Sequence, residues 1–178
     1  MEQHYPDWAT SPLMRDYYAN EWGRPVHGED ELYGLFCLEL FQAGLKWESV
    51  LKRRAALTAA FADFSIEEVA RFDAARIDLL CQNAAIIRNR MKITACVHNA
   101  QLLAEWHQAG KYFSPFLWAY NDGQPGRLVP AQDASLPATT PKATALAKEM
   151  KKAGFAFAGP KVVFSLLCAA GIVNGRLD

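Results

Sequence analysis

Apolar residues recur along most of this chain with the spacing of an α-helix. Leu32, Leu35 and Phe36 fall on one helical face, and the pattern returns in residues 97–106. No run alternates apolar and polar residues for long enough to build a strand ladder, and no internal repeat is detectable. The pattern therefore predicts an all-α fold.

Capping and stop signals set the expected helix boundaries. Ser11 before Pro12 is a favourable helix start, and Gly23 marks the following stop. Helices are expected over residues 12–20, 29–43, 47–61, 65–72, 73–85, 86–106, 113–120, 143–152 and 161–170. Residues 126–141 are rich in Pro, Ser, Thr and Gln, which predicts a surface loop. Within it, residues 127–129 are expected to be extended without forming a sheet.

Length and composition indicate one water-soluble globular unit. The 178 residues are enough to bury a sizeable core, so a single domain over residues 1–178 is expected. Hydrophobic residues make up 51% and charged residues 21%, the usual balance of a soluble protein. No apolar run reaches the ~18 residues that a membrane span needs. The first four residues show no secretory signal, so we expect a cytoplasmic protein without a membrane partner.

Charge and cysteine content narrow the classes of site. The formal net charge is +0, so any surface that binds nucleic acid must be a local patch. The four cysteines are widely separated in apolar helical contexts, which indicates reduced core thiols. No CxxC or HxxxH spacing occurs, so no internal metal site is expected. Arg88, Arg90 and Lys92 form a short basic run, for which a solvated helix entrance is the usual structure.

One carboxylate interrupts the apolar face of the helix expected over residues 29–43. Glu39 takes a position where the pattern asks for an apolar residue, and burying an unpartnered carboxylate is costly. The residues leave two interpretations open. Glu39 is either a structural acid that caps a neighbouring helix or pairs with an arginine, or an acid that binds a ligand. Trp47 follows just beyond the end of this helix and offers a flat ring nearby.

A glycine-bounded hairpin joins the last two expected helices. Residues 154–161 read Gly-Phe-Ala-Phe-Ala-Gly-Pro-Lys. Backbone N–H groups at the start of the following helix are a natural seat for a DNA phosphate, and Lys161 would add a positive charge. The alternative is a plain helix–helix corner, which the local sequence alone favours.

Several short motifs occur in colinear order along the chain. They are Asn-Glu-Trp-Gly at 20–23, Cys-Leu-Glu at 37–39, Phe-Gln-Ala-Gly-Leu at 41–45 with Trp47, Ile-Ile-Arg-Asn-Arg at 86–90, Phe-Leu-Trp at 116–118 and the Lys-Lys-Ala-Gly-Phe-Ala-Phe-Ala-Gly-Pro run at 151–160. Together they resemble the 3-methyladenine DNA glycosylase I family, and the similarity extends from Trp8 to Asn174. The resemblance implies a helix-hairpin-helix glycosylase fold. In this fold a helical bundle carries the hairpin near residues 144–170 and the termini pack together.

The resemblance implies a pocket for a base flipped out of DNA. Glu39 corresponds to the acid that recognises the base, and it is our candidate catalytic residue. Tyr17 and Trp47 correspond to aromatic residues that contact or stack on the base, with Trp22 close by. Methylation at N3 makes adenine cationic, and stacking a cation on an aromatic ring is favourable by roughly 0.5–2 kcal/mol. Neutral adenine gains less, so such a pocket selects the methylated base.

The resemblance also implies contacts with double-stranded DNA that contains alkylated adenine. Residues 42–45 are expected near the gap that the flipped nucleotide leaves, with Leu45 as a wedge. The resemblance favours phosphate binding over a plain corner for the hairpin. The DNA-binding candidates are Gln42, Gly44, Leu45, Gly154, Gly159 and Lys161.

This chain departs from the family pattern in two respects. The family usually ties its termini together with a zinc, but Tyr18 stands where one histidine ligand is expected and residues 174–178 offer neither a His nor a Cys. A structural zinc needs four ligands, so we predict no zinc and no other cofactor. Leu40 and Lys46 replace the usual Gly and Ser, and Leu40 is expected either to narrow the pocket or to alter helix packing.

The sequence thus predicts a monomeric DNA glycosylase that excises 3-methyladenine by hydrolysing its N-glycosidic bond in base excision repair. The main alternative is a module on the same fold that binds lesions or nucleobases without turnover. An unrelated helical structural protein would instead require the pocket residues to be buried in the core.

Overall fold

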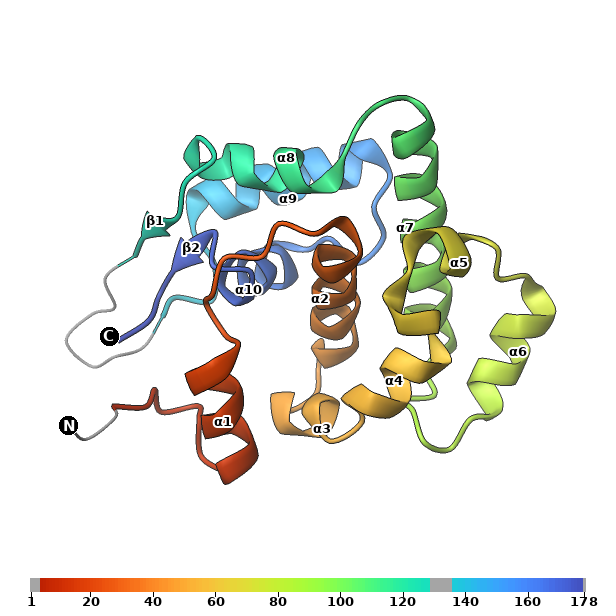
Figure 1. Ribbon diagram of the computed structural model, residues 1–178, viewed down its shortest axis with the longest axis horizontal. Helices are drawn as coiled ribbons and strands as arrows, with labels where there is room; N and C mark the ends of the chain where they lie inside the picture. Colours follow the sequence, from red (N-terminus) through yellow and green to blue (C-terminus); the bar gives the residue numbers. More distant parts are fainter. Residues whose placement is uncertain (1–3, 129–135, 178) are drawn as a thin grey trace.

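The computed structural model describes residues 4–128 and 136–177, and within them the fold is almost entirely helical (Figure 1). The α-helices are α1 (Pro12–Asn20), α2 (Glu29–Gln42), α3 (Trp47–Leu51), α4 (Arg54–Ala60), α5 (Ile66–Ala70), α6 (Ala74–Gln82), α7 (Arg90–Gln108), α8 (Phe113–Trp118), α9 (Pro141–Ala153) and α10 (Pro160–Ala169). Two 3₁₀ turns, η1 (Ala62–Phe64) and η2 (Ala119–Asn121), follow α4 and α8. The all-α prediction is therefore confirmed. No helix in the described part of the chain is long and apolar enough to cross a membrane.

Helix α2 lies at the centre of the molecule. Figure 1 shows α4 to α7 on one side of it, α8 and α9 across one end, and α1 and α3 near the other end. Leu32, Tyr33, Phe36, Leu40 and Phe41 are all fully buried, so most of the surface of α2 contacts other helices. A helix buried on nearly every side loses its amphipathic pattern, which leaves its few polar residues conspicuous.

Two expected helices differ from the structure. The helix expected over residues 86–106 begins only at Arg90, with Asn89 as its N-cap. The helix expected over residues 47–61 is broken into α3 and α4 by a turn at Lys52 and Arg53. Neither residue is a helix breaker, so the sequence carries no signal for this turn. Capping predictions fared better: the Ser11 side chain accepts a hydrogen bond from the backbone N–H of Met14, 3.4 Å away.

A short parallel strand pair corrects the expectation that no sheet is present. β1 (Gly126–Arg127) pairs with β2 (Val173–Asn174), with Gly126 opposite Val173. Two residues per strand give no alternation to detect, and the partners are far apart in sequence, so only the tertiary structure decides this pairing. Val129 and the rest of the 129–135 part of the predicted loop lie outside the described residues.

Candidate functional site

A cavity of about 410 Å³ opens beside the C-terminal half of α2. Glu39 and Gln42 line it from α2, and Trp47 lines it from the start of α3. The loop after α1 contributes Trp22, and α10 forms the opposite wall. The remaining lining residues are Pro6, Asp7, Trp8, Leu136, Pro137, Ala138, Phe164, Ser165, Cys168 and Gly175.

Glu39 is the buried acid of this cavity. Its side chain is 6% exposed, and burial raises the pKa of its carboxyl to about 8. Among residues 4–128 and 136–177, no hydrogen bond or ion pair engages this carboxyl, so it neither caps a neighbouring helix nor pairs with an arginine. A buried carboxyl without a protein partner is expensive, and its place in a cavity favours the ligand-binding interpretation.

Trp47 presents a second unsatisfied polar group beside the acid. Its indole Nε1–H is buried and makes no hydrogen bond, the one such side-chain atom in the described part of the chain. Trp47 and Glu39 therefore place an unpaired donor and an unpaired acid at the same cavity. Because buried polar groups are nearly always satisfied, an unpaired indole N–H beside an unpaired acid favours this cavity as the ligand-binding site.

Tyr17 lies next to this cavity but does not line it. Its ring centroid is 5.5 Å from that of Trp47, at an interplanar angle of 48°. Burial raises the pKa of Tyr17, and the charge of Glu39 raises it further, which places the two groups close together. The structure thus brings Glu39, Trp22, Trp47 and Gln42 to one cavity, whereas Tyr17 contacts Trp47 and lines the larger groove described next.

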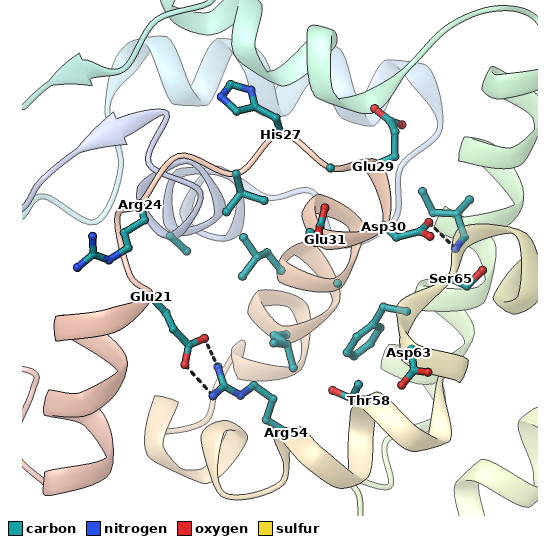
Figure 2. Close-up of a pocket in the computed structure, with 18 of the residues that line it drawn as sticks. Glu21, Arg24, His27, Glu29, Asp30, Glu31, Arg54, Thr58, Asp63 and Ser65 are labelled. Atoms are coloured by element: carbon teal, nitrogen blue, oxygen red, sulfur yellow. Dashed lines mark hydrogen bonds and ion pairs between the residues drawn. The ribbon is translucent and has the colours of Figure 1, made fainter.

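The larger groove of the molecule, about 1150 Å³, is distinct from the Glu39 cavity (Figure 2). It is rich in acids, and Glu21, Glu29 and Asp30 bond to other parts of the protein. Glu29 accepts hydrogen bonds from the backbone N–H groups that start α8, and Asp30 accepts one from the N–H of Ile66 at the start of α5. Figure 2 shows Glu21 directed at Arg54, with which it forms two hydrogen bonds of 2.6 and 2.9 Å. Glu29 and Asp30 are thus helix caps, and Glu21 is an ion-pair partner.

The turn between α2 and α3 carries the first group of DNA-binding candidates. Gly44 adopts a φ of +77°, and no atom lies within 4 Å of where its Cβ would be. The amide Nε2 of Gln42 donates to the carbonyl of Leu45 at 3.0 Å, which closes the turn. The Leu45 side chain is 41% exposed. The turn therefore presents an apolar side chain to solvent next to the cavity.

Lys92 holds this turn in place and corrects an expectation. The sequence predicted a solvated basic run, but Lys92 is 7% exposed, and its Nζ donates to the carbonyls of Phe41 at 2.8 Å and Ala43 at 2.6 Å. Burial lowers the pKa of this ammonium group. Arg88 and Arg90 are exposed, as predicted.

The hairpin between α9 and α10 carries the second group of candidates. Gly154 ends α9 at a φ of +106°, and Gly159 is the N-cap of α10 with open space around it. Asn99 of α7 is fully buried and holds the hairpin through both ends of its amide. Its Nδ2 donates to the carbonyl of Ala156 at 3.1 Å, and its Oδ1 accepts from the N–H of the same residue at 2.8 Å.

Helix α10 connects this hairpin to the cavity. Lys161 is exposed in its first turn, and Ser165, four residues later, lines the cavity. Residues four apart lie on the same face of a helix. The open N-terminus of α10 and the cavity wall are therefore one helical turn apart.

The structure also settles the expected effect of Leu40. Its side chain is fully buried in the core and lines neither cavity. Adjacent residues on a helix point about 100° apart, so Leu40 turns into the core where Glu39 turns into the cavity. Of the two expectations, helix packing applies and narrowing of the pocket does not.

Several cavity residues carried no usable signal in the sequence. Asp7 and Trp8 precede α1, Ser165 sits inside an ordinary apolar helix, and residues 136–138 belong to an irregular segment. Trp8 entered the sequence analysis only as the first residue of the family resemblance. Tertiary packing alone brings the other residues to Glu39.

Comparison with known proteins identifies the family. Residues 8–178 match the methyladenine glycosylase family. The chain belongs to this family. It is 37% identical over 169 residues to DNA-3-methyladenine glycosylase 1 of Escherichia coli (strain K12), covering 95% of this chain and 90% of that protein.

Solved structures of methyladenine glycosylases share the fold. A crystal structure of 3-methyladenine DNA glycosylase I superimposes with a TM-score of 0.91 at 39% identity, covering 96% of this chain and 94% of the other. A variant of 3-methyladenine DNA glycosylase I in complex with 3-methyladenine gives a TM-score of 0.89 at 37% identity, covering 95% and 91% of the two chains.

The zinc that the resemblance implies does not fit the residues present in this methyladenine glycosylase. No group of three or more His, Cys, Asp or Glu side chains with metal-binding geometry occurs in residues 4–128 and 136–177. At the position of the expected histidine, the Tyr18 hydroxyl accepts a hydrogen bond from the N–H of Leu177 at 2.9 Å. The guanidinium of Arg176 lies 4.7 Å from the centroid of the Tyr18 ring. A permanent cation at this place opposes a divalent metal ion.

Proposed function

We propose that this protein is a DNA-3-methyladenine glycosylase that flips the damaged nucleotide from double-stranded DNA and hydrolyses its N-glycosidic bond. The observation that carries the proposal is the unpartnered Glu39 carboxyl, buried in a cavity that Trp22 and Trp47 also line. The family relatives named for this activity support the same conclusion.

Recognition of the base follows from charge and stacking. In the free protein Glu39 is largely protonated at neutral pH, because burial raises its pKa to about 8. A cationic base lowers this pKa, so the bound lesion faces a carboxylate that accepts from the exocyclic amine and balances the charge. The ring of Trp47, which lines the same cavity, supplies an aromatic face on which the cationic base stacks. Neutral adenine offers no charge to offset the burial of an ionised Glu39.

The DNA contacts divide between the two candidate groups. Leu45, exposed at the α2–α3 turn, is suited to fill the gap that the flipped nucleotide leaves in the stack. The N-terminus of α10 with Gly159 and Lys161 is suited to bind a backbone phosphate. Because Ser165 on the same face lines the cavity, a strand held at Lys161 passes the cavity mouth.

Cleavage uses the weakness of the damaged bond. The base loses its positive charge as it leaves, so holding the cation against a carboxylate does not by itself accelerate bond breaking. Glu39 therefore contributes mainly to choosing the lesion, and enclosure of the flipped nucleotide lets water replace the base at C1′. Glu39 remains the proposed catalytic residue in the sense that it contacts the departing base.

The deciding experiment measures release of 3-methyladenine from methylated duplex DNA by wild type, Glu39→Gln and Glu31→Gln. Glu31 is an exposed acid on the same helix and is the matched control. We expect wild type and Glu31→Gln to release 3-methyladenine equally. The preference of Glu39→Gln for 3-methyladenine over unmodified adenine should fall by about tenfold or more, with less 3-methyladenine released. A wild-type protein that binds free 3-methyladenine but releases none from DNA would instead establish a binding module. Equal release by all three proteins would refute the role of Glu39.

A further inference from the structure

Arg176 joins the C-terminal segment to the end of α1. One guanidinium nitrogen donates hydrogen bonds to the carbonyl of Tyr18 at 2.7 Å and to that of Trp22 at 2.8 Å. The Cζ atom of the guanidinium also lies over the Tyr18 ring. The carbonyls at the end of a helix lack intrahelical partners and carry partial negative charge, so a cation is the favoured partner there.

The surrounding residues make room for this side chain. Gly23 adopts a φ of +73°, and a Cβ on it would lie 2.9 Å from the Cγ of Arg176. A larger residue at 23 would therefore displace the arginine. The backbone of Arg176 is held as well, because its N–H donates to the Oδ1 of Asn174 at 3.0 Å.

These contacts lead directly to the cavity that contains Glu39. Trp22, whose carbonyl Arg176 holds, lines the cavity, and so does Gly175, the residue before Arg176. The rings of Tyr18 and Trp22 are stacked at 5.6 Å with an interplanar angle of 29°. Arg176 thus bonds to the backbone of Trp22 on one wall of the cavity and directly follows Gly175 on another. Its guanidinium also lies over the Tyr18 ring, against which Trp22 stacks.

We infer that Arg176 is a positioning residue that fixes the Trp22 wall of the base pocket and joins it to the C-terminal segment. This inference rests on the proposed function. The tie uses a guanidinium, two carbonyls and an aromatic face, and needs no metal. An arginine stays charged at all pH values at which the protein is folded, so the tie is insensitive to both chelators and pH.

Arg24 provides a matched control. It caps the same helix, because its Nη2 donates to the carbonyl of Ala19 at 2.7 Å. It is exposed, and it lines the larger groove but not the Glu39 cavity. Loss of Arg24 therefore removes a cap from α1 without touching Trp22 or Gly175.

The test compares wild type, Arg176→Met, Arg176→Lys and Arg24→Met. We expect Arg176→Met to raise the KM for methylated DNA and the Kd for free 3-methyladenine about tenfold, with kcat changed less than about twofold. In Arg176→Lys the KM and the Kd should rise only about threefold. An ammonium group still donates to the two carbonyls, but it lacks the planar surface of a guanidinium against the Tyr18 ring. Arg24→Met should lower only the Tm. EDTA should leave the wild-type values unchanged.

The outcomes separate this inference from the proposed function. Wild-type affinity in Arg176→Met, or equal loss of affinity in Arg176→Met and Arg24→Met, would overturn the positioning role. If Arg176→Met does not fold, Arg176→Lys decides by the same comparison. The indole N–H signal of Trp22 in an NMR spectrum, assigned with Trp22→Phe, gives a readout without substrate. It should shift in both Arg176 variants and stay in place in Arg24→Met, even if the wild type proved inactive on methylated DNA.

Discussion

The Nζ of Lys92 lies 2.6 Å from the carbonyl oxygen of Ala43, which ties the start of α7 to the end of α2. The same ammonium group caps the carbonyl of Phe41. A cation at this end of α2 satisfies carbonyls that have no helical partner and opposes the negative end of the helix dipole. Because Glu39 sits in the last turn of α2, Lys92 also fixes the segment that carries the acid.

Replacing Lys92 tests this capping role. Lys92→Met should lower the free energy of unfolding by about 1–3 kcal/mol, because two nearly buried carbonyls lose their donor. It should also weaken binding to methylated duplex DNA, because the turn that holds Leu45 loses its support. Urea denaturation and DNA titration measure the two effects. Lys111→Met, at an exposed lysine after α7, is the control and should change neither quantity.

The raised pKa of Glu39 predicts a specific pH dependence of stability. The folded-state pKa of about 8 exceeds the ordinary value of 4.5, so the unfolded chain ionises first as the pH rises. Between about pH 4.5 and pH 8 the wild type should therefore lose up to about 1.4 kcal/mol of stability per pH unit through this group. Glu39→Gln should match wild type near pH 4.5 and become the more stable protein near pH 8. An equal difference in unfolding free energy between wild type and Glu39→Gln at both pH values would contradict the raised pKa of Glu39.

Binding of the lesion should depend on pH in the opposite direction. A cationic base needs the ionised form of Glu39, so the KM for methylated DNA should fall as the pH rises from 6 to 8. Glu39→Gln should show no such slope. The comparison must be made at constant ionic strength, because phosphate contacts are sensitive to salt.

Replacing Trp47, whose indole N–H is unpaired, should affect base binding and protein stability differently. Trp47→Phe keeps an aromatic ring at the cavity, although a smaller one for stacking, and removes a buried donor that makes no hydrogen bond. We expect the affinity for free 3-methyladenine to fall several-fold while the Tm stays the same or rises, since an unsatisfied buried donor costs about 1–3 kcal/mol. A fall in both quantities would indicate that the indole has only a packing role.

Asn99 offers a way to disturb the hairpin without touching the base pocket. Asn99→Leu fills the space but leaves the N–H and carbonyl of Ala156 without their partner. The variant should lose about 1–3 kcal/mol of stability and bind duplex DNA more weakly, with unchanged affinity for free 3-methyladenine. Gel-shift and base titration distinguish the two ligands. Weaker binding of free 3-methyladenine would contradict this prediction, because it would show that the hairpin also shapes the base pocket.

The sequence alone determined the all-α class and most of the helices. Helical periodicity and caps such as Ser11 are local signals, read without knowledge of the fold. Glu39 also stood out locally, because a carboxylate on an apolar helical face conflicts with its surroundings. The break at Lys52 and Arg53 was missed because it has no local residue signature.

Tertiary structure alone decided what surrounds these elements. Whether Leu40 enters the pocket depends on the rotation of α2 against its neighbours, and burial of Lys92 depends on the end of α2 lying against the start of α7. The contact of Arg176 with Tyr18 and Trp22 joins residues more than 150 positions apart. Such contacts leave no periodic trace, because they depend on which surfaces meet once the helices have packed.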